Sequence, residues 1–145
     1  MSDGLLPAWL VWALLSACFA ALTAILAKLG VESISADVAT LIRTAVVFLL
    51  LVGLFVASGE SLSPASISPK TALFLVLSGL ATGASWLCYF RALKLGPASQ
   101  VAPVDKLSVV LVALFGVLVL GERLSGVNWL GVVLITAGVV LLAIK

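Results

Sequence analysis

The sequence contains no histidine, and only 10% of its 145 residues are charged. A soluble domain carries about 25% charged residues, so this composition belongs to the membrane class. Without histidine, and with one carboxylate inside its apolar runs, the chain offers neither a Ser-His triad nor a carboxylate pair. We therefore expect no enzymatic activity. The 8 basic and 6 acidic residues nearly balance, which gives no signature of nucleic-acid binding.

Cysteine is almost as scarce. Cys18 and Cys88 both fall inside apolar runs, 70 residues apart. Cysteines in such positions are typical small buried side chains, so we predict neither a disulfide nor a metal site between them and expect no cofactor.

Apolar runs fill most of the chain. Each is about as long as the roughly 20 residues that a helix needs to cross a ~30 Å hydrocarbon layer. We expect Gly30 to stop the first helix after Lys28, and Asp37 to cap the second. The prediction is an all-α integral membrane protein, a bundle of five transmembrane helices forming one domain, residues 1–145. The predicted spans are about 8–28, 37–57, 70–95, 98–120 and 127–144.

The fourth run carries Pro103, Asp105 and Lys106 in its first half. Ionisable residues inside a membrane cost ~2.5–3.5 kcal/mol each on insertion scales, so they tend to mark a function. Pro103 removes a backbone donor and clashes with the Ser99 carbonyl, which weakens the helix and makes Pro103 a candidate hinge. The alternative is that Asp105 and Lys106 only neutralise each other near the membrane edge.

Further candidate site residues lie in three other places. Arg43 is about two turns inside the second run, where it either snorkels to the headgroups or has a buried role. Trp86 and Tyr89 are three residues apart and share a helix face, and Ser108 shares a stripe with Asp105.

Antiparallel spans bring these residues to one half of the bilayer. We predict that Arg43, Trp86, Tyr89, Asp105 and Lys106 line a shared polar cavity. Asp105 can pair with one cation, which leaves a spare cation to attract an anionic or carboxylate-bearing ligand. The alternative is a structural ion pair that fixes helix register. The basic residues near the ends of the spans also favour this side, so the positive-inside rule places the N-terminus outside and the C-terminus in the cytoplasm.

The stretch WLCYFRALKLGPASQVAPVDKLSVV, the GERL turn and NWLGVVLITAGVVLL resemble the EamA-type half of the drug/metabolite transporter superfamily, and the short five-span bacterial and archaeal members in particular. The resemblance implies a compact helical bundle in the plasma membrane that moves small metabolites or drugs. Larger members carry two such halves, inverted relative to each other. The related small multidrug exporters depend on a glutamate in their first span. No acidic residue lies in the first span here, so their proton-coupled mechanism is not carried over.

The leading interpretation is a transporter subunit that moves a small-molecule substrate by alternating access. One repeat with an odd number of spans predicts a homodimer, in a parallel or an antiparallel arrangement. Gly131 and Gly138 on the last span are the candidate contact. The alternative is a non-transporting helical bundle that stabilises or modulates another membrane protein.

Overall fold

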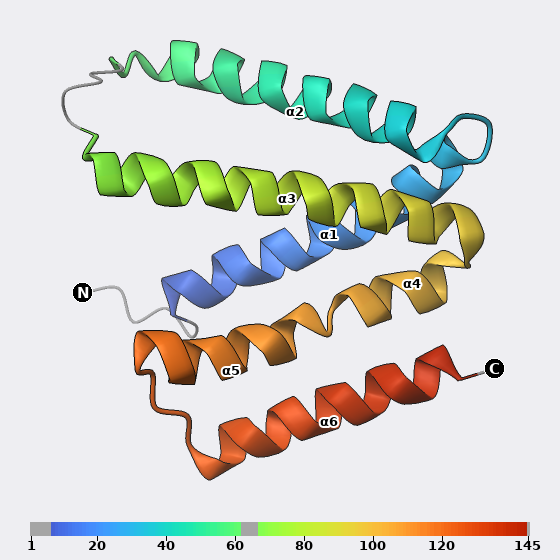
Figure 1. The fold of residues 1–145 in the computed structure, drawn as a ribbon, viewed down its shortest axis with the longest axis vertical. Coiled ribbons are helices and arrows are strands. Elements are labelled where there is room, and N and C mark those ends of the chain that lie inside the picture. The colour runs from blue at the N-terminus through green and yellow to red at the C-terminus, as the bar shows by residue number, and fades with distance from the viewer. Residues whose placement is uncertain (1–6, 62–66, 145) are drawn as a thin grey trace. The chain divides into compact units, whose positions relative to one another are not determined.

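The computed structural model describes residues 7–61 and 67–144, in which all the regular structure is helical. Figure 1 shows the helices in chain order. They are α1 (Ala8–Val31), α2 (Ala36–Ser58), α3 (Pro69–Leu95), α4 (Ala98–Asp105), α5 (Ser108–Leu120) and α6 (Gly126–Ala143). With α4 and α5 taken together as Ala98–Leu120, five helices are long and apolar enough to cross a membrane. The predicted fold class is therefore confirmed. Asp3, Lys145 and residues 62–66 of the predicted link 58–69 lie outside the described residues.

Two details at the helix ends were predicted wrongly. Gly30 does not stop the first helix, because α1 continues to Val31. The N-cap of α2 is Ser35, whose hydroxyl oxygen accepts a hydrogen bond from the Val38 amide at 3.2 Å. A serine hydroxyl two residues before Asp37 is as good a cap as a carboxylate, so Asp37 falls in the first helical turn.

The chain divides into two compact units. One, which we call the α2–α3 unit, is Ala27–Lys94 and contains the last turn of α1. The other, the α4–α6 unit, comprises the described parts of Met1–Leu26 and Leu95–Lys145.

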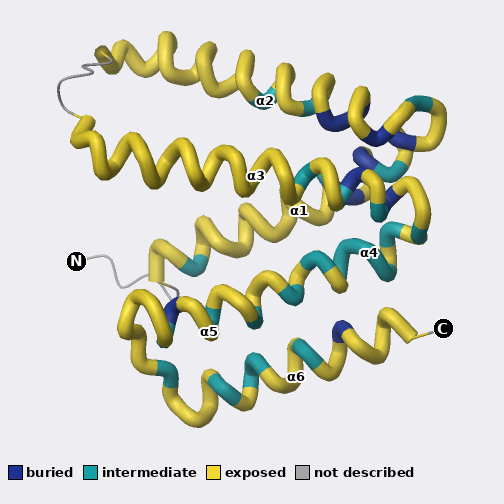
Figure 2. The backbone as a smooth tube through the Cα atoms, viewed as in Figure 1, coloured by how far each residue is buried: buried dark blue, intermediate teal, exposed yellow. Residues whose placement is uncertain are grey.

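The α2–α3 unit is closed at one end by small and apolar side chains. Val31 and Leu93 are fully buried there, and Phe90 is 3% exposed. Ala36 and Ala39 are also buried, because alanines let neighbouring backbones approach closely. Figure 2 shows these buried positions together where α1 joins α2 and where α3 ends.

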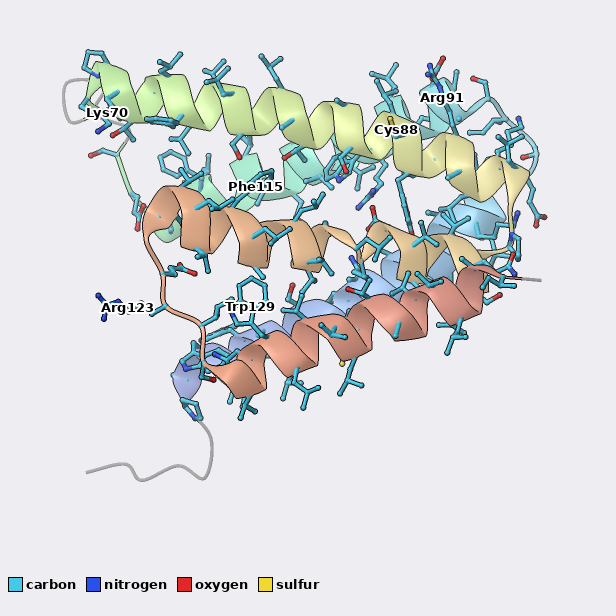
Figure 3. The ribbon with its side chains drawn as sticks, turned by 60° about the horizontal axis from the view of Figure 1, so that its bottom comes forward. Lys70, Cys88, Arg91, Phe115, Arg123 and Trp129 are labelled. Carbon is cyan, nitrogen blue, oxygen red and sulfur yellow. The ribbon has the colours of Figure 1, made fainter. Side chains whose placement is uncertain are left out.

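Away from this end, α2 and α3 expose leucine, valine and phenylalanine along their length. Leu49 and Leu80 are each 67% exposed. Exposed apolar surface costs about 25 cal/mol per Å² in water, so side chains arranged in this way require a hydrocarbon environment. Lys70 and Arg91 lie towards opposite ends of α3 in Figure 3.

In the α4–α6 unit, α6 packs back along both α4 and α5 (Figure 1). The connection between α5 and α6 turns at Gly121, whose φ of +70° lies in the left-handed region that favours glycine. Ser125 then caps α6 by accepting a hydrogen bond from the Asn128 amide at 3.2 Å. Trp129 lies in the first turn of α6, as Figure 3 shows.

Candidate functional site

Arg43 lies on α2 and reaches the aromatic side chains of α3. Its guanidinium carbon is 4.3 Å from the ring centroid of Trp86 and 5.6 Å from that of Phe90. A guanidinium over a ring face is attracted by the ring quadrupole, by about 0.5–1 kcal/mol at exposed sites and ~2 kcal/mol when desolvated. The contact therefore fixes the direction of Arg43 across the space between the two helices of the α2–α3 unit.

The aromatic side of this contact is built from a single helical turn. Trp86 and Phe90 are four residues apart, so they lie one above the other on the same face of α3. Tyr89 meets Phe90 edge to face, with ring centroids 6.5 Å apart and an interplanar angle of 80°. The aromatic cluster (Trp86, Tyr89 and Phe90) thus forms one wall of the site.

Within the described part of the chain, no acidic side chain compensates the charge of Arg43. Among residues 7–61 and 67–144, no carboxylate forms an ion pair with it and no acceptor takes a hydrogen bond from it. Its side chain is neither fully buried nor fully exposed. The five N–H donors of this guanidinium are therefore oriented by the rings, and none of them has an acceptor among the described residues.

Three basic side chains form contacts at the end of the α2–α3 unit where Val31 and Leu93 are buried. The ammonium of Lys28 donates to the Leu93 carbonyl at 2.7 Å, and that of Lys94 donates to the Ile34 carbonyl at 2.6 Å. Arg91 forms an ion pair with Asp37 at 3.1 Å, with both side chains more than 60% exposed. An exposed ion pair of this kind contributes ~0–1 kcal/mol, so it sets geometry more than it sets stability.

The α4–α6 unit holds the second group of candidate residues, at an interruption of the membrane span. After Pro103, the Leu107 amide donates to the Val104 carbonyl at 3.0 Å, and the Val109 amide donates to the Lys106 carbonyl at 3.0 Å. Both bonds span three residues, as in a 3₁₀ turn, in place of the four of an α-helix. The regular helix consequently ends at Asp105 and resumes at Ser108.

Asp105 and Lys106 form an ion pair at this interruption, with Nζ 3.3 Å from Oδ2. The aspartate side chain is 36% exposed and the lysine side chain 56%. Ser108 begins α5 and is exposed. The pair carries no net charge. Its two polar groups and the interrupted backbone nevertheless lie inside an apolar span.

The structure thus brings together the predicted residues within each unit. Arg43, Trp86 and Tyr89 belong to one cluster, and Asp105, Lys106 and Ser108 to the other. That both groups line one shared cavity stays a prediction. Cys18 and Cys88 are free, and no group of three or more metal-ligating side chains occurs in the described part of the chain.

Three residues that form contacts in the α2–α3 unit were not predicted from the sequence. Phe90 is the second ring under Arg43, and the signal for it was its four-residue spacing from Trp86, which places both on the same face. The backbone contacts of Lys28 and Lys94 leave no local pattern, because their partners are carbonyls about 60 residues away in sequence.

A further contact joins the GERL turn to α5. The Glu122 amide donates to the Gly116 carbonyl at 3.0 Å, and its carboxylate lies over the same glycine. A Cβ at position 116 would be 2.7 Å from the Glu122 Oε2. The glycine therefore makes room for the folded-back glutamate.

Residues 7–144 match the EamA-like transporter family. An uncharacterized transporter in the cobO 3' region of a Sinorhizobium species is 61% identical over 136 residues, which cover 94% of this chain and 96% of that protein. A putative nucleotide-sugar transporter of Saccharomyces cerevisiae, YMD8, is 38% identical over 68 residues, 46% of this chain and 15% of the yeast protein. No solved structure matches the chain.

Proposed function

The chain belongs to the EamA-like transporter family and is a multi-pass membrane protein, and from this premise we propose that it moves small metabolites or drugs across the membrane by alternating access. The observation that carries the mechanism is the interruption of the fourth span at Lys106–Leu107. In secondary transporters, discontinuous helices supply polar backbone and charged groups to a site within the bilayer. We propose no enzymatic step and no cofactor.

The proposed pathway is lined by Arg43, Trp86 and Tyr89 of the α2–α3 unit and by Asp105, Lys106 and Ser108 of the α4–α6 unit. Pro103 is the proposed hinge, because its missing amide leaves the Ser99 carbonyl without its helical donor just before the interruption. A proline kink allows the two halves of the span to change angle without breaking a full set of helical hydrogen bonds.

We propose further that the working unit is a homodimer, with α6 at the contact. On α6, Val132 and Val139 belong to the more buried face, whereas Gly131 and Gly138 lie about 100° round the helix. A Cβ added at either glycine would have nothing within 4 Å, so this face is open to the close approach of another helix. The relative from Sinorhizobium is matched over 96% of its own length, so it is of similar size.

The proposed membrane is the bacterial or archaeal plasma membrane, with the N-terminus outside. Lys28, Arg91 and Lys94 gather at the end of the α2–α3 unit that would face the cytoplasm. This is the distribution that the positive-inside rule describes.

The transport function is tested by the water accessibility of the pathway. Single cysteines replace Trp86, Asp105 or Ser108 in a background in which Cys18 and Cys88 are serine, and each variant is treated with a polar thiol reagent in intact membranes. A pathway predicts reaction at all three positions, whereas the lipid-facing control Leu118→Cys, at a residue that is 78% exposed on α5, stays inert. Inert cysteines at all three positions would support the non-transporting bundle instead.

A further inference from the structure

The six other basic residues within the described part of the chain fall into two classes. Lys28, Arg91 and Lys94 contact carbonyls or a carboxylate at the end of the α2–α3 unit, and Lys106 is paired with Asp105. Lys70 lies in the first turn of α3, and Arg123 lies in the connection between α5 and α6. Arg43 differs from both classes, because it lies eight residues inside α2 from the N-cap, about 12 Å along the helix axis, and its partners among the described residues are aromatic rings.

The geometry of this contact decides what Arg43 can still bind. A guanidinium whose carbon lies over a ring can stack its flat face on that ring, which leaves the N–H donors in its own plane for another partner. Those donors form a fork that matches the two oxygens of a carboxylate or two of the oxygens of a phosphate. Trp86 and Phe90 hold the fork in place without competing for its hydrogen bonds, so little side-chain entropy is left to lose when an oxyanion binds.

We infer that Arg43 is the group that recognises the substrate, and that the substrate is a small organic anion bearing a carboxylate or a phosphate. The inference rests on the proposed transport function and names the substrate class of its site. In it, the guanidinium edge takes the oxyanion, and Trp86 and Phe90 act as positioning residues that orient the guanidinium. An uncompensated cation inside an apolar span is costly, and an anionic substrate offsets that cost at the moment of binding.

A lipid phosphate has the same head-group chemistry, since a long arginine side chain can reach towards the interface. A lipid phosphate and a soluble anionic substrate would reach Arg43 in different ways. A lipid headgroup occupies the site whenever anionic lipid surrounds the protein, whereas a substrate arrives from water and can be titrated.

Trp86 is the natural reporter for this test, because it touches the guanidinium. Replacing Trp9, Trp12 and Trp129 by phenylalanine leaves Trp86 as the only indole in the chain. The purified protein is placed in nanodiscs of phosphatidylcholine. Its fluorescence is then titrated with four probes that share one phenyl body: benzoate, phenyl phosphate, benzylamine and benzyl alcohol.

We expect benzoate and phenyl phosphate to change the Trp86 fluorescence saturably, and benzylamine and benzyl alcohol to do so only at much higher concentration. Arg43→Gln, which keeps a polar side chain but removes the charge, should weaken the apparent affinity for both anions about tenfold or more. Arg43→Lys keeps the charge but not the fork, so the affinity of this variant for both anions should lie between those of the unsubstituted protein and of Arg43→Gln. The matched control Lys94→Gln removes a cation of the same unit and should change the affinity less than about twofold.

Three results would overturn the inference: no response to either anion, an equal response to the amine or the alcohol, or an unchanged affinity in Arg43→Gln. A fourth is a fluorescence change on adding phosphatidylglycerol that also blocks benzoate, which would assign Arg43 to a lipid. None of these decides the transport function, which depends on the accessibility of positions 86, 105 and 108. A protein with reactive cysteines and no anion response would remain a transporter with a different substrate class.

Discussion

Arg43 and Lys106 are the two cations of the described residues that lie about two helical turns inside their membrane spans, and they are held in opposite ways. Lys106 has its counter-charge next to it in the sequence, and the Asp105 carboxylate lies 3.3 Å from its ammonium. Arg43 has no carboxylate partner among the described residues and rests on the rings of Trp86 and Phe90. The first site is electrically neutral as it stands, and the second becomes neutral only when an anion binds.

This difference separates two tasks that a transporter site has to perform. An ion pair at a helix interruption can stay in place while the helix bends, because its charges remain paired in each state. An oriented but uncompensated cation is suited to selecting a ligand by charge. We therefore propose that the α2–α3 unit recognises the substrate and that the α4–α6 unit undergoes the conformational change.

The largest effect is expected from removing the uncompensated cation. Arg43→Gln should lower the transport of an organic anion such as benzoate into proteoliposomes by about tenfold to a hundredfold, the loss typical of a charge-assisted hydrogen bond. Membrane insertion should be normal, because the variant removes a charge from an apolar span. Unchanged uptake in this variant would remove the distinction between the two cations.

The second-largest effect is expected from breaking the ion pair between Asp105 and Lys106. Asp105→Asn keeps the side-chain volume but leaves Lys106 without its carboxylate, and we expect transport to fall about tenfold with normal insertion. The double variant Asp105→Asn/Lys106→Met restores neutrality and serves as the control. If the pair only fixes helix register, the double variant should transport normally, and if it lines the pathway, transport should stay low.

The origin of this contrast also shows how far the sequence alone can be read. The five spans follow from the lengths of the apolar runs, and the interruption follows from Pro103, Asp105 and Lys106, which are neighbours in the chain. The contact between Arg43 and Trp86 joins residues 43 positions apart and depends on how α2 and α3 are rotated against each other. No local pattern encodes that rotation. Both residues could therefore be predicted from the sequence as site candidates, but whether Arg43 snorkels or has a buried role could not.

A smaller effect is expected at the proposed hinge. Pro103→Ala returns a donor to the Ser99 carbonyl and removes a helix-breaking cost of ~3 kcal/mol, so the span should become straighter and the protein more stable. Transport should slow several-fold because the two halves of the span move less freely. Pro97→Ala is the matched control, since Pro97 is the N-cap of α4 and its loss leaves the helix interior unchanged. Faster transport in Pro103→Ala would contradict a hinge.

The smallest effect is expected from a substitution next to Glu122, a charged residue that belongs to neither site. In Gly116→Ala the new Cβ would meet the Glu122 Oε2 at 2.7 Å, and the flexible carboxylate can move away at little cost. We expect the free energy of unfolding to fall by less than about 0.5 kcal/mol, with transport unchanged. In a Glu122→Ala background the same substitution should cost nothing, which thermal unfolding of both proteins will check. A large loss of transport would extend the pathway to the GERL turn.

The most direct test of the account asks whether the two sites serve one pathway. Ser108→Cys, in a protein without Cys18 and Cys88, is labelled with a polar maleimide in the presence and absence of benzoate, with Arg43 intact or replaced by glutamine. The account predicts that benzoate slows the labelling at position 108 severalfold when Arg43 is present, and has no effect in Arg43→Gln. A labelling rate that does not depend on benzoate in either protein would contradict it.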